Sequence, residues 1–308
     1  MDVQIVSKKL ITPSHLQNMT ISFMDQLISP RTVPFIFYYS ANGSNIRADS
    51  VVERQKSLMG KSLSEILTLY YPLAGRYIKI MDAFTFSLFT NGWAKACKVG
   101  INDVTIIPNF ESGILFPPRD ISEYKVIQPL TKSKSDQVVT KRFVFNAKTI
   151  SELKADHQAT RLNCKPSTIE VLTALIWRAQ INAARARFGC LRTSVLLEVM
   201  NLRGTEDDDD ELEEFFFSKV IMKPYIEIFE EIKKGEGDVH VFSSLRNFPF
   251  YEVDFGWGKP DWVSFAPRPC KGVLFIDGKD GDAGVEAWVT MEEKEMTYFR
   301  KDPSIMIT

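Results

Sequence analysis

The chain has 308 residues, of which 44% are hydrophobic, and this is enough to bury the cores of two ordinary domains. Its 38 lysines and arginines nearly balance its 39 aspartates and glutamates, so the formal net charge is −1. This balance argues against nucleic acid as a partner, because a nucleic-acid-binding surface needs an excess of cations. The longest uncharged stretches, Leu10–Met24 and Thr32–Ile46, are too short to cross a bilayer, and we expect no membrane span.

The first twenty residues contain no long apolar core before a cleavage site, and Lys8 and Lys9 follow the first apolar residues. This pattern does not fit a signal peptide, so we expect the protein in the cytosol. The four cysteines are scattered without paired spacing: Cys97, Cys164, Cys190 and Cys270. Such spacing indicates reduced thiols rather than a disulfide framework or a zinc site, and we expect no bound metal.

The first predicted elements are a strand and two helices. Val33–Tyr39 is aromatic and β-branched, which predicts a buried strand. Apolar residues at helical spacing follow, and Pro72 must end that helix because its ring cannot continue the hydrogen-bond ladder. The residues of this apolar stripe are Leu63, Ile66, Leu67 and Tyr70. The apolar segment Ala83–Lys98 predicts a second helix, although it contains Gly92, and Tyr77–Ile80 predicts a short strand between the two helices.

Pro108–Pro118 predicts a loop, and the polar connector Thr131–Gln137 leads to a predicted domain boundary. A strand at Lys141–Phe145 follows this connector. Ser167 and Glu170 then have the spacing of a capping box, in which each side chain accepts a hydrogen bond from a backbone donor at a helix start. The apolar stripe after this box predicts a helix that runs toward Gly189.

The last third of the chain again mixes strands and helices. Thr193–Met200 predicts a strand, and the spacing of apolar residues over Tyr225–Ile232 predicts a helix. Val273–Ile276 and Val285–Val289 are separated by a loop with two Asp-Gly pairs, which predicts a hairpin. The intermingling of the two types indicates a mixed α/β fold.

An acidic run occupies Glu206–Glu211. Six neighbouring carboxylates repel one another, so we interpret the run as a solvated loop. A calcium-binding loop is the sharper alternative, but Leu212 and Ser218 stand where that loop needs glycine and glutamate.

Few residues of the chain carry obvious chemistry. Gly256 and Gly258 are followed by Asp261 where a dinucleotide-binding loop needs its third glycine. The chain has three histidines, and none has the spacing of a zinc-binding pair. They are His15, His157 and His240, and each fits a surface or packing role better than a catalytic one.

The most specific string is Asp254–Pro260, which reads Asp-Phe-Gly-Trp-Gly-Lys-Pro. By composition alone it predicts a tight turn with a packed indole. The string also resembles the Asp-Phe-Gly-Trp-Gly signature of the plant BAHD acyltransferases. Further segments fit the same family, and within it the chain is most similar to the branch that contains vinorine synthase. These segments are Ile21–Gln26, Tyr71–Arg76, Asn91–Trp93, Pro166–Thr168, Asn201–Arg203 and Ala287–Thr290.

The resemblance implies a two-domain fold like that of the coenzyme A-dependent acyltransferases, of which chloramphenicol acetyltransferase is an example, in an incomplete form. Residues 1–135 are expected to form a shortened N-terminal lobe and residues 136–308 a C-terminal lobe that carries the Asp254 signature. The implied activity is transfer of an acyl group from acyl-CoA, a co-substrate, to a hydroxyl or amine of a small plant metabolite such as an alkaloid or terpenoid alcohol. A monomer without a permanent cofactor is expected.

The family's catalytic motif is His-x-x-x-Asp, and here the sequence departs from it. Asp82 matches the carboxylate, whereas the position of the histidine holds Ile78, which cannot move a proton. We interpret this as a junction beside Ile78 where family members have a longer segment, with a second gap after Arg203. By resemblance, Asp82 is structural and pairs with an arginine, for which Arg203 is the candidate.

The remaining signature residues are expected to be architectural: Asp254, Phe255, Gly256, Trp257 and Gly258. Two hypotheses therefore follow. In the first, the chain is an acyltransferase whose activity is weakened at Ile78. In the second, it is an inactive remnant that binds acyl-CoA or a partner protein.

Overall fold

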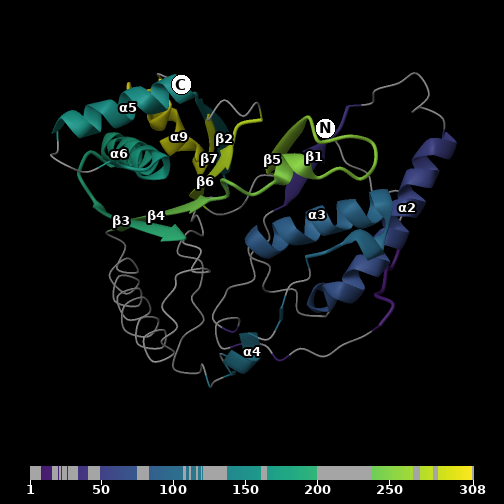
Figure 1. The fold of residues 1–308 in the computed structure, drawn as a ribbon. Helices are drawn as coiled ribbons and strands as arrows, with labels where there is room; N and C mark the ends of the chain where they lie inside the picture. Colours follow the sequence, from purple (N-terminus) through teal and green to yellow (C-terminus); the bar gives the residue numbers. More distant parts are fainter. Residues whose placement is uncertain are drawn as a thin grey trace. The chain divides into compact units, whose positions relative to one another are not determined.

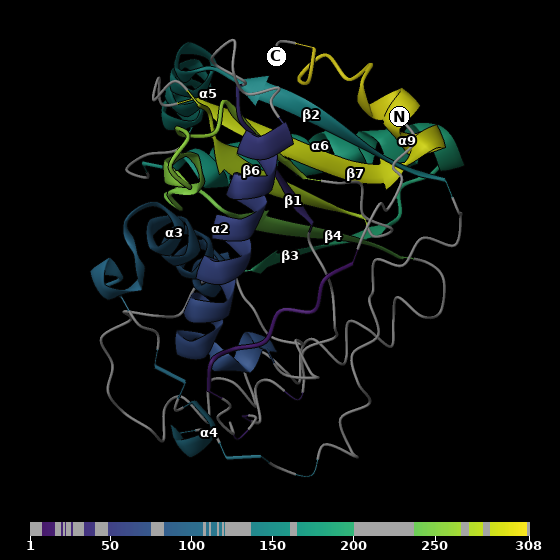
Figure 2. The ribbon, with the colours of Figure 1, turned by 90° about the vertical axis from the view of Figure 1, so that its right-hand side faces the viewer.

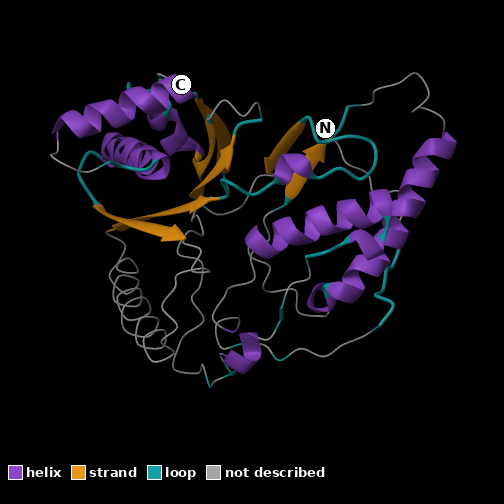
Figure 3. Ribbon diagram, in the orientation of Figure 1, coloured by secondary structure: helices purple, strands orange, loops and turns teal. Residues whose placement is uncertain are grey.

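The computed structural model is shown in Figures 1–3. It describes residues 8–15, 20, 22, 26, 34–40, 49–74, 83–106, 109, 110, 112–115, 117, 118, 120, 137–160, 165–199, 237–265, 271–279 and 284–306.

The chain divides into two compact units. The first contains Met1–Gln128 together with Phe248–Ala266, and the second contains Pro129–Asn247 together with Pro267–Thr308. The sequence places the Asp254 signature in the C-terminal lobe, whereas the structure packs it with the N-terminal unit. The physical reason is strand pairing, because β5 (Trp262–Phe265), which follows the signature, is hydrogen-bonded to β1 (Phe35–Tyr38).

Two long helices form the core of the first unit, as predicted. Helix α2 spans Asp49–Leu69 and gives way at Pro72 to the 3-10 turn η1 (Tyr71–Ala74), and α3 spans Ala83–Val99. Ile66 and Tyr70 are fully buried between them. A Cβ at Gly92 would lie 3.4 Å from the Ile66 Cδ1 atom, so glycine allows α3 to pass close to α2.

The first unit also contains a two-stranded antiparallel sheet. Phe35 of β1 is opposite Phe265 of β5, and its ring also contacts Phe250. The predicted strand is present, but the prediction that it is buried is wrong. Burial alternates along β1, where Ile36 is 39% exposed and Tyr38 is 41% exposed, as expected for a strand with one covered face.

The second unit is built on a five-stranded sheet, drawn in orange in Figure 3, whose described strands have the order β2-β7-β6-β4-β3. Strands β3 and β4 are parallel, as are β4 and β6, and the other neighbours are antiparallel. The β6–β7 pair confirms the predicted hairpin. The strands are β2 (Val138–Phe145), β3 (Thr193–Val199), β4 (Gly237–Ser244), β6 (Gly272–Asp277) and β7 (Val285–Glu292).

Helices α5 (Ala147–Thr160), α6 (Thr168–Phe188) and α9 (Glu293–Phe299) cover one face of this sheet (Figures 1 and 2). The predicted capping box is confirmed, since Ser167 accepts from the Glu170 amide and Glu170 accepts from the Ser167 amide. Gly189 closes α6 with a left-handed φ of 76°, which favours glycine.

An ion-pair network joins α6 to the β7–α9 corner. Arg187 contacts Glu292 at 2.6 Å and Glu295 at 2.8 Å, and Lys271 contacts the same two carboxylates at 3.2 and 3.1 Å. Two cations thus neutralise two carboxylates that are only 12% exposed. Removing one cation would leave poorly solvated negative charge, which is why the corner depends on both.

Several predicted features need a separate account. The predicted strand at Tyr77–Ile80, the helix at Tyr225–Ile232 and the acidic run lie outside the described residues. The predicted loop Pro108–Pro118 contains the short helix α4 (Ser112–Leu115). The 3-10 turns η2 (Ile101–Asp103) and η4 (Phe250–Glu252) complete the described elements.

In the described parts of the chain, no helix combines the length and apolar character needed to cross a membrane.

His240 is a strongly perturbed base among the described residues of the second unit. It lies on β4 with its Nε2 atom buried and without a hydrogen-bond partner among the described residues. Burial lowers the pKa of His240 to about 4, with the charge of Asp238 acting in the opposite direction and that of Lys271 adding to the effect. The folded state therefore holds the neutral imidazole.

This burial predicts a pH-dependent stability. The unfolded imidazole gains a proton below pH 6.5 and the folded one only near pH 4, so stability falls as pH falls through this window. The loss reaches about 3 kcal/mol. In chemical unfolding from pH 7 to 4, His240→Leu should lose less stability than the wild type; parallel curves for the two proteins would contradict the assignment.

Candidate functional site

The predicted site residues fall into two groups. Ile78, Asp82 and Arg203 lie outside the described residues, so their pairing and their position remain predictions. The Asp254–Gly258 signature is described in full, and it forms a turn directly after η4. The geometry of the candidate site therefore rests on this turn and on the side chains that hold it.

The carboxylate of Asp254 organises the turn. Its Oδ1 atom accepts hydrogen bonds from the Gly256 amide at 2.8 Å and the Gly258 amide at 2.9 Å. Its Oδ2 atom accepts one from the Lys98 ammonium group at 2.6 Å. The hydrogen bond from Lys98, together with the two amides, lowers the pKa of Asp254 below its ordinary value, against the effect of burial. Asp254 is thus a charged anchor at neutral pH.

Both glycines of the turn have a backbone conformation that other residues avoid. Gly256 has φ 109° and Gly258 has φ 107°. A Cβ on Gly256 would meet the Lys98 side chain only at 3.8 Å, and one on Gly258 would meet nothing within 4 Å. Glycine is therefore needed for the backbone angle, which directs both amides at one carboxylate, and not for lack of space.

Aromatic rings fix the remaining two signature residues. Phe255 and Trp257 are stacked with ring centroids 5.5 Å apart. The ring of Phe255 is also nearly perpendicular to that of Trp93 on α3, with centroids 4.9 Å apart. Tyr39 lies edge-on to both signature rings and donates a hydrogen bond to the Val253 carbonyl at 2.8 Å. Burial and the charge of Asp254 raise the pKa of Tyr39, so its phenol stays protonated as a donor.

Helix α3 supplies further contacts to the same region. The Asn91 side chain donates to the Pro249 carbonyl at 3.2 Å, and the Trp93 indole donates to the Met59 carbonyl at 3.3 Å and to Ser62 at 3.2 Å. Burial raises the pKa of the Cys97 thiol, which keeps it protonated and a poor nucleophile. The α3 face thus positions the turn but offers no reactive group.

Sequence reasoning identified the turn but missed Lys98 and Tyr39. Lys98 ends the predicted helix, and Tyr39 ends the predicted strand, so each was seen only as part of an element. Their contacts with the turn join residues more than 150 positions apart, and no local pattern reports such pairing.

The described arrangement supports structure more than chemistry. Every oxygen of Asp254 is satisfied, Tyr39 is a protonated donor, and no pair of nucleophile and base is present in the turn. His240 belongs to the other unit. The described residues contain no cluster of histidine, cysteine, aspartate or glutamate that would hold a metal ion. The architectural role expected for the signature stays a prediction.

A sequence model described as the Transferase family matches residues 1–79, 78–227 and 209–306, which together span nearly the whole chain. The chain belongs to the BAHD acyltransferases. The matched segments meet at residues 78–79, beside the junction expected at Ile78, and two of them overlap at residues 209–227, which follow the gap expected after Arg203.

Curated BAHD relatives align over the whole chain. The acetyl-CoA-benzylalcohol acetyltransferase of Clarkia breweri is 25% identical, with 99% of each chain covered. The stemmadenine O-acetyltransferase of Catharanthus roseus is 24% identical, with 97% of this chain and 96% of the relative covered. The first alignment spans 439 positions, more than the 308 residues of this chain, so the relative contains internal segments without a counterpart here.

The fold is that of a solved BAHD structure. The crystal structure of vinorine synthase matches with a TM-score of 0.69 and 22% identity, covering 95% of each chain. The mixed α/β fold expected from the sequence is therefore confirmed.

The hydrogen bonds of the turn predict an order of stability losses. Asp254→Ala removes three hydrogen bonds to a charged group and should lower the free energy of unfolding by about 2 kcal/mol. Lys98→Met removes only the half-exposed partner and should cost less than about 1 kcal/mol. Urea unfolding measures both; an equal loss in the two variants would show that the ion pair, and not the backbone amides, dominates.

Proposed function

We propose that this chain uses acyl-CoA as donor and transfers the acyl group to a hydroxyl or amine of a small plant metabolite, at a rate limited by the lack of a general base. An alkaloid or terpenoid alcohol is the proposed acceptor class. Membership of the BAHD family supports the reaction type. The names of two relatives, an acetyl-CoA-benzylalcohol acetyltransferase and a stemmadenine O-acetyltransferase, support an alcohol as acceptor. We further propose a cytosolic monomer.

The reaction requires a proton to move. The acceptor oxygen or nitrogen forms a bond to the thioester carbonyl carbon, the carbon–sulfur bond breaks, and coenzyme A leaves as a thiolate. The proton of the acceptor must pass to a base and finally to that thiolate. A positioned imidazole accelerates such a transfer by about a hundredfold to ten-thousandfold, and Ile78 cannot replace it.

The observation that carries the proposal is the intact Asp254 turn in a chain with an altered catalytic motif. The turn keeps its carboxylate, its two glycines and its stacked rings, each with a defined contact. Proximity alone still accelerates a reaction when donor and acceptor are held together. A slow transferase is therefore physically reasonable for a BAHD chain of this composition.

Ile78 also favours a second candidate function. A chain that binds acyl-CoA without turning it over is an inactive remnant, and it would act by sequestering the donor or by pairing with another protein. The lost segments favour a partner, because a sheet that loses strands exposes edges that other chains can pair with.

An activity assay separates the two functions. The purified chain with acetyl-CoA and benzyl alcohol should release coenzyme A thiol slowly, above a control without protein. Ile78→His returns an imidazole to the motif spacing and should raise kcat by about a hundredfold, whereas the matched variant Ile78→Gln should not. The gain should be lost below pH 6.5, where imidazole is protonated.

The remaining outcomes are also decisive. Stabilisation by acetyl-CoA in a thermal melt, without thiol release in any of the three proteins, would support the remnant. The absence of both stabilisation by acetyl-CoA and thiol release would contradict both proposals.

A further inference from the structure

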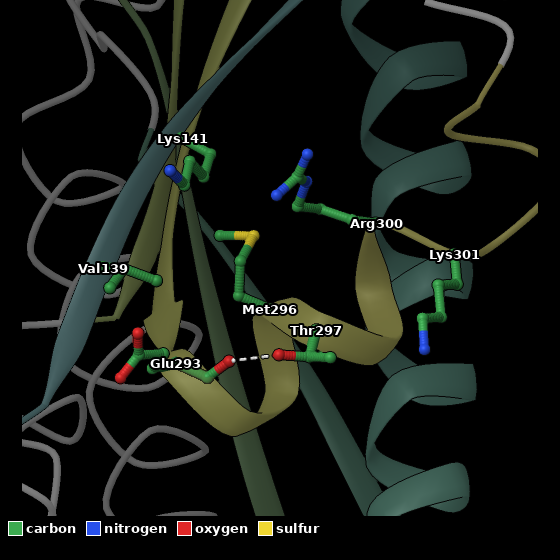
Figure 4. Close-up of a pocket in the computed structure, with 7 residues that line it drawn as sticks. All are labelled: Val139, Lys141, Glu293, Met296, Thr297, Arg300 and Lys301. Atoms are coloured by element: carbon green, nitrogen blue, oxygen red, sulfur yellow. Dashed lines mark hydrogen bonds between the residues drawn. The ribbon is translucent and has the colours of Figure 1, made fainter.

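A cavity of about 470 Å³ lies between β2 and α9 in the second unit (Figure 4). Its volume is within the range of small-molecule sites and far exceeds that of a single water or ion. The lining residues come from one strand and one helix with its following turn: Val139, Lys141, Glu293, Met296, Thr297, Arg300 and Lys301. None of them belongs to the Asp254 turn or to the predicted catalytic motif.

Positive charge dominates this cavity. Three of the seven lining side chains are cationic and one, Glu293, is a carboxylate. In Figure 4, Arg300 extends from the end of α9 toward the strand that carries Lys141, with Met296 between them. The Thr297 hydroxyl already donates to the Glu293 carbonyl at 3.1 Å, so the polar groups left at the mouth are mainly cations.

Among the described residues, the three cations of the cavity lack a carboxylate partner, as do exposed cations of the same unit such as Lys165 and Lys294. Elsewhere in the described part of this unit, carboxylates at 2.6–3.2 Å pair with other cations, namely Arg142, Arg187, Arg192, Arg246 and Lys271. A helix C-terminus attracts cations, which accounts for the two after α9 but not for Lys141 on the strand.

The position of Lys141 on the sheet is unusual for a cation. It is opposite Val289, a fully buried residue of the core, so its side chain leaves the sheet on the face that α9 covers. Strand β2 is at one end of the described strand order, and this lets the ammonium group reach solvent beside α9. The sequence therefore places a cation at a position where an apolar residue would extend the core.

We propose that this cavity binds a phosphate ester. The excess of two positive charges matches a phosphate group, which Arg300 and Lys141 can bind by charge-assisted hydrogen bonds from opposite sides. The side chain of Val139 offers an apolar surface to the organic part of the ligand, and Met296, which is only 3% exposed, forms the floor beneath it. Two sources carry this group: coenzyme A itself, through its nucleotide, and an unrelated phosphorylated metabolite.

Calorimetric titration of the full chain with phenyl phosphate tests the proposal. The wild type should bind it saturably, and more tightly than inorganic phosphate. The double variant K141Q/R300Q should raise the Kd by roughly tenfold or more, because it removes both cations that face the ligand. The matched control K165Q/K294Q removes two exposed charges outside the cavity and should leave the Kd unchanged.

Three results would overturn the proposal. They are no saturable binding of phenyl phosphate, an equal Kd for inorganic phosphate, or an equal loss of affinity in the two double variants. If coenzyme A displaces phenyl phosphate from the wild type but not from K141Q/R300Q, coenzyme A is the source of the phosphate group. If coenzyme A does not displace it, the ligand is an unrelated phosphate ester. The titration needs no acyl transfer, so its outcome is independent of the proposed activity.

Discussion

One carboxylate joins segments of the first unit that are 156 positions apart in the sequence. Asp254 accepts hydrogen bonds from two glycine amides and from the Lys98 ammonium group, and these three bonds fix the turn. The strand that follows this turn pairs with β1, and helix α3 carries both Lys98 and Trp93. The turn therefore links the sheet of this unit to its helices, and its hydrogen bonds add to the β1–β5 pairing that docks the late segment on the early one.

The family motifs that can be located in the structure all serve the architecture. Asn91 and Trp93 position the η4 segment and α2, Ser167 starts α6, and Trp288 lies in the buried strand β7. Packing and hydrogen bonding explain each of them without reference to a substrate. By resemblance, the chemistry of the family depends instead on a histidine, and we propose that Ile78 occupies its position here. On this proposal, the chain retains the supports of a BAHD enzyme while its proton acceptor is missing.

Local sequence patterns predicted the elements that begin or end with strong signals. The capping box of α6, the proline after α2 and the Asp-Gly pairs between β6 and β7 each specify a boundary through backbone chemistry. The β4 strand and the short helix α9 lack such signals and were not predicted. Helix α5 was also missed, although Asn146 caps its start by accepting a hydrogen bond from the Thr149 amide. The docking of 248–266 on the first unit was also missed, because it depends on contacts between distant residues such as Phe35 and Phe265. The Lys98 partner of Asp254 was missed for the same reason.

The central claim is that the scaffold of an acyl-CoA-dependent transferase has lost its proton acceptor. A crystal structure of the chain with coenzyme A bound tests this most directly, because it shows which side chains surround the sulfur atom. We predict that the sulfur lies beside Ile78, with no imidazole, carboxylate or amine within hydrogen-bonding distance. A histidine or another base in contact with the sulfur, or coenzyme A bound far from Ile78, would contradict the account.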